Sequence, residues 1–61
     1  MSNKQRIKKM NDDQVQAWYI QYSVMREAPF RSEQARRKYY DECIKLLRAE
    51  AQSRGLELRE P

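Results

Sequence analysis

Residues 11–28, NDDQVQAWYIQYSVMREA, determine the fold that we expect for this chain. Asn11 is a favourable helix N-cap, and Gln14 stands three residues later, in the position of a capping box. Pro29 disfavours helical geometry in the residue before it, so the helix cannot extend past it. These signals predict a helix over residues 12–28.

A second helix is expected after a short turn. Residues 29–32 form the predicted turn, and Ser32 is the predicted N-cap of a helix over residues 33–54. Gly55 follows it, the residue type that most readily takes the left-handed conformation at a helix end. The predicted fold is all-α, an antiparallel two-helix hairpin. The second helix has a broad apolar side made of Tyr39, Tyr40, Cys43, Ile44, Leu46, Leu47 and Ala51.

The segments on either side of the hairpin, residues 11–55, carry weaker signals. Residues 1–10 contain four basic and no acidic side chains, and after the initiator methionine only Ile7 and Met10 are large and apolar. This composition predicts a basic flexible arm. Residues 56–61 are too short to assign to an element, and we expect a short frayed tail.

The first helix carries two apolar stripes that point in nearly opposite directions. The aromatic stripe consists of Val15, Trp18, Tyr19, Tyr22 and Met25. The small stripe consists of Ala17, Ile20, Val24 and Ala28. One neighbouring helix can cover only one of them, and the pattern does not decide which one faces outward. Because Trp, Tyr and Met are frequent contact residues, the aromatic stripe is the candidate protein interface.

Self-association would cover the remaining apolar surface. A chain of 61 residues buries too little surface to be very stable alone. The sequence therefore predicts a homodimer, in which two hairpins pack as a four-helix bundle.

Composition argues against an enzyme. With no histidine, one cysteine and one glycine, the chain lacks the residues for a histidine-based triad, a common zinc site, an internal disulfide or a glycine-rich phosphate loop. We expect no cofactor, no metal and no small-molecule substrate. No apolar run approaches the roughly 20 residues that span a bilayer, and the N-terminus does not resemble a secretory signal, so we expect a cytoplasmic protein without a membrane partner.

The resulting functional hypothesis is a small, non-enzymatic helical protein that binds and regulates a larger protein partner, as an accessory factor or an inhibitor. The alternative is a DNA- or RNA-binding protein, because the chain has a formal net charge of +4 with clustered basic residues. The candidate nucleic-acid contacts are Lys4, Arg6, Lys8, Lys9, Arg31, Arg36, Arg37 and Lys38.

Overall fold

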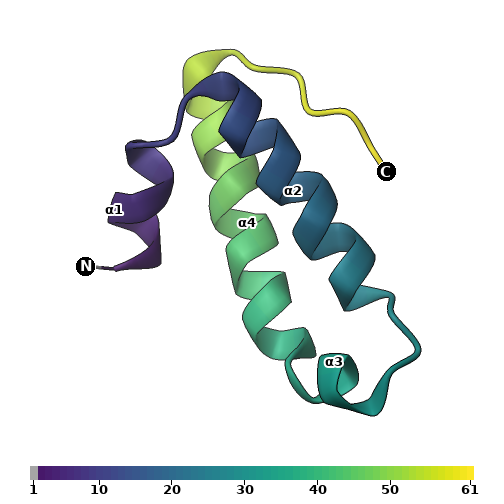
Figure 1. The fold of residues 1–61 in the computed structure, drawn as a ribbon. Helices are drawn as coiled ribbons and strands as arrows, with labels where there is room; N and C mark the ends of the chain where they lie inside the picture. The colour runs from purple at the N-terminus through teal and green to yellow at the C-terminus, as the bar shows by residue number, and fades with distance from the viewer. Residues whose placement is uncertain (1) are drawn as a thin grey trace.

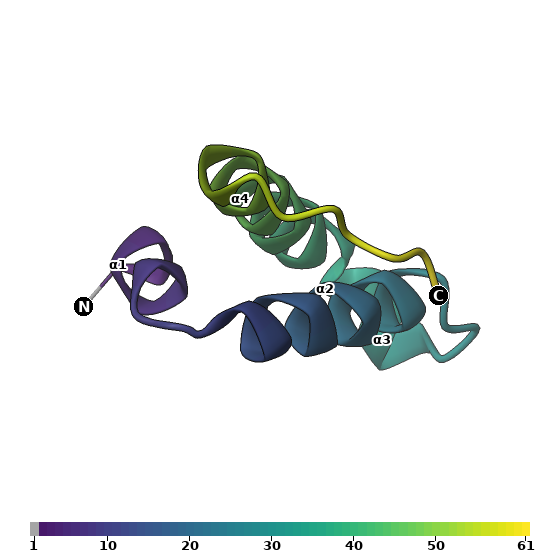
Figure 2. The same cartoon turned by 90° about the horizontal axis from the view of Figure 1, so that it is seen from above.

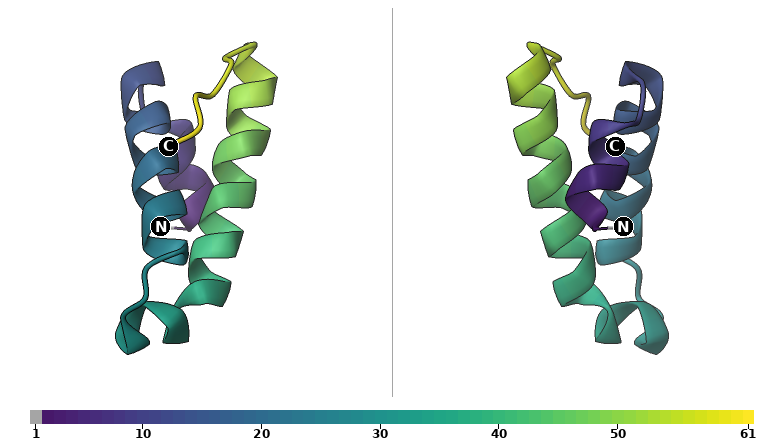
Figure 3. Two further views of the ribbon diagram at one scale, coloured as in Figure 1. Left: turned by 90° about the vertical axis from the view of Figure 1, so that its right-hand side faces the viewer. Right: turned by 90° about the vertical axis from the view of Figure 1, so that its left-hand side faces the viewer.

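The computed structural model describes residues 2–61, apart from the side chains of Ser32 and Glu33. Within this part of the chain there are helices and no strands, which confirms the all-α class (Figure 1). The helices are α1 (Asn3–Lys8), α2 (Asp12–Arg26), α3 (Arg31–Ala35) and α4 (Arg37–Arg54). The two long helices, α2 and α4, lie side by side and run in opposite directions (Figures 1 and 3).

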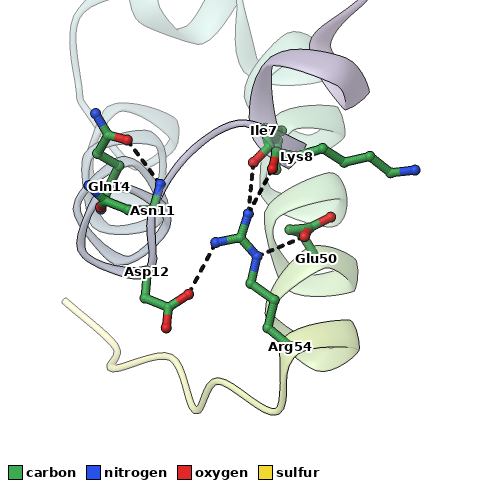
Figure 4. Close-up of polar contacts among 7 residues, drawn as sticks. All are labelled: Ile7, Lys8, Asn11, Asp12, Gln14, Glu50 and Arg54. Carbon is green, nitrogen blue, oxygen red and sulfur yellow. Dashed lines mark hydrogen bonds and ion pairs between the residues drawn. The ribbon is translucent and has the colours of Figure 1, made fainter.

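The start of α2 follows the local sequence signals. The side chain of Asn11 accepts a hydrogen bond from the backbone N–H of Gln14 at 2.8 Å. In return, the Gln14 side chain accepts one from the Asn11 N–H at 3.0 Å (Figure 4). The predicted capping box is confirmed. The helix ends at Arg26, two residues earlier than expected, with Glu27 as its C-cap.

The predicted helix over residues 33–54 is divided in two. Helix α3 begins at Arg31, inside the predicted turn, and Arg36 separates it from α4 with φ −96° and ψ 8°. Ser32 therefore lies within a helix and does not precede one. The predicted N-cap contact of Ser32 depends on a side chain that is outside the described part of the structure. The break allows α3 to lie across the end of the α2–α4 pair (Figures 1 and 3).

The end of α4 confirms the predicted left-handed glycine. Gly55 has φ 69°, and the N–H of Leu56 donates to the carbonyl oxygen of Ala51 at 2.8 Å. The Gly55 N–H donates to the carbonyl oxygen of Gln52 at 3.2 Å. Together these bonds form a Schellman ending, which satisfies carbonyl groups at the end of the helix.

The N-terminal segment differs from the flexible arm that the sequence predicted. Helix α1 begins with a capping box between Ser2 and Gln5, and Ile7 is buried, with 5% of its surface exposed. Ile7 belongs to the same core cluster as Val15 and Leu47. Met10, which follows α1, also packs against this cluster, so both large apolar side chains of the segment contact the core. Met1, which belongs to the predicted arm, lies outside the described residues.

The C-terminal segment, residues 56–61, is also more ordered than a frayed tail. Leu56 and Leu58 pack against the core. The side chain of Gln16 donates to the carbonyl oxygen of Arg59 at 2.9 Å and accepts from its backbone N–H at 2.6 Å. Figure 2 shows this segment on one side of the α2–α4 pair and α1 on the other. The two chain ends therefore extend a core that two helices alone would leave partly open. The buried residues are Ile7, Val15, Tyr19, Tyr40, Cys43, Leu47 and Ala51.

Candidate interaction surface

Four aromatic rings from α2 and α4 meet on the side of the helix pair that also carries α1. The ring centroids of Trp18 and Tyr22 are 5.5 Å apart, and those of Tyr22 and Tyr40 are 5.9 Å apart. Tyr39 joins the cluster, 6.3 Å from Tyr22 and 5.9 Å from Tyr40. We call these four residues the aromatic face. Tyr40 is buried, but Trp18 is 42% exposed and Tyr39 45% exposed, so the cluster reaches the surface.

A pocket of about 130 Å³ lies where the aromatic face meets α1. It is lined by Asn3, Arg6, Ile7, Met10, Trp18, Tyr22 and Cys43. Most of these side chains are apolar, and Arg6 is the one charged residue among them. The pocket can accept an apolar side chain, and Arg6 places a positive charge at the edge of the pocket.

Burial changes the chemistry of Tyr22. Loss of solvation raises the pKa of its hydroxyl from 10.0 to about 12, and the neighbouring Cys43 and Tyr39 add to the shift. The hydroxyl therefore stays neutral throughout the physiological range. Its role at this surface is to pack and to hydrogen-bond, not to carry charge.

The structure divides the predicted interface residues between core and surface. Val15 and Tyr19 are buried, with 0% and 1% exposed, so these two side chains hold the fold together and are not available to a partner. Tyr22 and Met25 are partly buried, and Trp18 alone is well exposed. The reason is geometric: the aromatic stripe is wide enough for one edge to face α4 while the other faces solvent.

The sequence-based prediction missed Tyr39. It was assigned to the packed apolar side of the second helix, but it lies at the edge of that side, next to Lys38. On the helical wheel this edge position is the only sequence signal for its exposure, and the signal is weak.

The small stripe of α2 lies mostly away from α4. Val24 is 54% exposed, and Ala17 is exposed as well. Ile20 and Ala28 are partly buried, and Ile20 packs against the core. Helix α2 thus presents apolar side chains on two of its sides, as its sequence predicts.

The candidate nucleic-acid contacts form two separate groups. Lys4, Arg6, Lys8 and Lys9 lie on or directly after α1, and all four are exposed. In the second group, Arg31 lies on α3, Arg36 between α3 and α4, and Arg37 and Lys38 at the start of α4, and all four are exposed. Figure 1 places α1 beside the second half of α4 and α3 at the opposite end of the helix pair. In the second group Arg37 is partly neutralised, because its guanidinium lies 3.9 Å from the carboxylate of Glu27.

A polar groove of about 540 Å³ lies on the other side of the helix pair, beside the C-terminal segment. The hydroxyl of Tyr19 lies 2.7 and 2.9 Å from the two carboxylate oxygens of Glu60 and donates its proton to them. It accepts a hydrogen bond from the Arg48 guanidinium at 3.0 Å, and this contact raises the pKa of Arg48 above its ordinary value. These three side chains of the lining are therefore already hydrogen-bonded to one another.

Arg54 joins three helices at one end of the molecule. Its guanidinium donates to Glu50 at 2.7 Å, to Asp12 at 3.1 Å, and to the carbonyl oxygens of Ile7 and Lys8 at 3.3 and 3.1 Å (Figure 4). The hydrogen bonds to Glu50 and Asp12 raise its pKa above the ordinary value. A cation at the C-terminal end of α1 also interacts favourably with the helix dipole. These contacts hold α1 in the position that forms the pocket.

No cluster of three or more His, Cys, Asp or Glu side chains that could hold a metal ion occurs among the described residues. Cys43 is a free thiol with 2% of its surface exposed. None of the described helices combines the length and apolar character required to cross a membrane.

Comparisons of the chain with protein-family models, with curated proteins and with solved structures gave no match. Functional inference therefore depends on the geometry of this surface.

Proposed function

We propose that this chain is a small, non-enzymatic binding protein that regulates a larger protein partner through the aromatic face. The observation that carries this proposal is the half-exposure of Trp18 and Tyr39 within one packed cluster of rings. Large aromatic side chains dominate the binding energy of many protein interfaces. Their rings are held by Tyr22 and Tyr40, so little conformational entropy would be lost on binding.

The test is an affinity capture of the partner with the wild-type chain and with Trp18→Ala, each with and without nuclease. We expect the partner to bind the wild type in both conditions and to be lost from Trp18→Ala. Phe30→Ala is the matched control, because Phe30 is a 69% exposed aromatic residue outside the aromatic face. Retention of every partner by a folded Trp18→Ala variant would contradict the proposal.

A second part of the proposal is that the chain forms a homodimer through the small stripe of α2. Two antiparallel α2–α4 pairs would then make a four-helix bundle, and the exposed side chains of Ala17 and Val24 would become part of its core. This arrangement leaves the aromatic face free for the partner. The proposed setting is the cytoplasm, which suits the free thiol of Cys43.

The alternative proposal is nucleic-acid binding through the basic residues of α1 together with Arg36, Arg37 and Lys38. Lys4, Arg6, Lys8 and Lys9 are exposed on an ordered element, and none of them forms an ion pair within the described residues. Such a group would contact phosphates, and its affinity would fall steeply with salt. A fluorescence titration with DNA and RNA at low and high salt tests this. We expect charge reversal at Arg36 and Arg37 to weaken binding to all sequences, and an absence of response at low salt would remove the alternative.

A further inference from the structure

Helix α1 is an example of a helix that packs on the side of the α2–α4 pair where the aromatic face lies. It inserts Ile7 between α2 and α4, where the side chain is 5% exposed within the cluster of Val15 and Leu47. Figures 1 and 3 show that α1 covers only the half of the helix pair that lies near the end of α4. The aromatic face lies on the same side as α1, towards the α3 end, and the pocket connects the two.

The charged groups around this uncovered half are mostly basic. Arg6 of α1 lines the pocket, and the first turn of α1 has no acidic residue. At the other end, the exposed Arg36 stands three residues before Tyr39, and the first turn of α4 also lacks acidic residues. The exposed Glu42 follows Tyr39 by three residues on α4, but its side chain lines the groove on the opposite side of the helix pair. The surface is therefore apolar in the middle and positively charged at both ends.

We infer that the aromatic face and its pocket bind an acidic amphipathic helix of the partner protein, placed next to α1 on the α2–α4 pair. This inference rests on the proposed function and specifies the chemistry of the partner. The apolar residues of the partner helix, three or four positions apart, fill the pocket beside Trp18 and Tyr22. Its carboxylates lie near Arg6 and Arg36, where opposite charges favour association and orientation.

The ring geometry favours a protein helix over single-stranded nucleic acid. Bases stack on aromatic rings whose flat faces are open. Here Tyr22 packs against Trp18 with an interplanar angle of 30° and against Tyr39 at 84°, so these neighbours cover part of the Tyr22 ring. A half-open pocket of about 130 Å³ with a mainly apolar lining suits an aliphatic side chain better than a base.

The test uses Trp18, the one tryptophan of the chain, as a fluorescent reporter of the surface. The probes are a synthetic peptide with leucine at every third or fourth position and glutamate elsewhere, the same peptide with lysine in place of glutamate, and oligothymidylate. We expect the emission of Trp18 to shift on titration with the glutamate peptide, which binds roughly tenfold more tightly than the lysine peptide.

Two charge-reversal variants test whether the glutamate peptide binds at the pocket. Arg6→Glu should weaken binding of the glutamate peptide by a similar factor, whereas Lys45→Glu should leave it nearly unchanged, because Lys45 lines the groove on the opposite side. Equal responses to the two peptides, equal effects of the two reversals, or a stronger response to oligothymidylate would each overturn the inference. A partner that depends on Trp18 but shows no acidic preference would overturn this inference and leave the proposed function standing.

Discussion

The guanidinium of Arg54 donates a hydrogen bond at 3.1 Å to the main-chain oxygen of Lys8, which lies 46 residues earlier in the chain. Lys8 is the last residue of α1, and carbonyl groups at a helix end have no partner within the helix. Arg54 therefore satisfies the end of α1 and at the same time joins it to α2 through Asp12.

Replacement of Arg54 should release α1 without unfolding the helix pair. In Arg54→Gln the contacts to Ile7 and Lys8 are lost, so hydrogen exchange of the α1 amides should approach that of an unstructured peptide, while α2 and α4 remain protected. Native-state hydrogen exchange measures both. Lys45→Gln removes a positive charge elsewhere on α4 and serves as the control. Unchanged protection of α1 in Arg54→Gln would show that apolar contacts hold the helix without Arg54.

Two valines on α2 provide a matched test of the core. Val15 is fully buried and Val24 is 54% exposed. Val15→Ala should lower the free energy of unfolding by about 2 kcal/mol, from lost apolar burial and the cavity that remains. Val24→Ala should change it by less than about 0.5 kcal/mol per monomer when measured at a concentration too low for dimers. Urea denaturation followed by circular dichroism gives both values, and equal losses would contradict the position of α2.

The C-terminal segment should contribute measurable stability through Tyr19 and Glu60. A double-mutant cycle with Tyr19→Phe and Glu60→Gln should give a coupling free energy of about 1 kcal/mol, as expected for a hydrogen bond to a carboxylate near the surface. Glu57 makes no hydrogen bond or ion pair within the described residues, so the cycle with Glu57→Gln should give a value near zero. A coupling near zero for Glu60 would mean that the segment is not docked in solution.

Stability should fall between pH 10 and 12 because of Tyr22. In the unfolded chain its hydroxyl ionises near 10.0, whereas in the folded chain its pKa is raised to about 12. Over this interval the unfolded form releases a proton that the folded form retains, so the free energy of unfolding decreases as pH rises. In Tyr22→Phe this contribution disappears and the decrease should be shallower. Chemical denaturation at several alkaline pH values compares the two proteins, and identical slopes would rule out the shift.

The proposed homodimer makes a prediction about mass. Light scattering should give twice the monomer mass of 7.5 kDa at high concentration, and Tm should rise with concentration. Val24→Glu should return the monomer mass, because it places a charge in the proposed contact, whereas Phe30→Glu should not. A wild-type mass of 7.5 kDa at every concentration would exclude the dimer.

The parts of the fold that local sequence determines were predicted well. The N-terminus of α2 depends on Asn11 and Gln14, and the end of α4 depends on Gly55, all of which act within a few residues of their own position. The break at Arg36 was not predicted, because no proline or glycine marks it. The break lies where the chain turns from α3, at the end of the helix pair, into α4.

The two chain ends were predicted poorly because distant residues determine their positions. Ile7 is buried because it packs in one cluster with Val15 and Leu47. The backbone N–H of Arg59 donates a hydrogen bond to the side chain of Gln16, 43 residues away. The same limit applies to the candidate surface. Periodicity identified Trp18 and Tyr22, but the division of the aromatic stripe between core and solvent depends on the angle at which α4 and α1 approach α2.

The positions of the two chain ends determine where an affinity tag can be attached. A tag fused before Ser2 would emerge beside Asn3, which lines the pocket, and would compete with any ligand there. A tag fused after Pro61 would emerge on the far side of the helix pair, next to Glu60 and away from the aromatic rings. Immobilisation for capture or surface-based assays is therefore better made through the carboxyl end, provided that a spacer leaves the carboxylate of Glu60 in place.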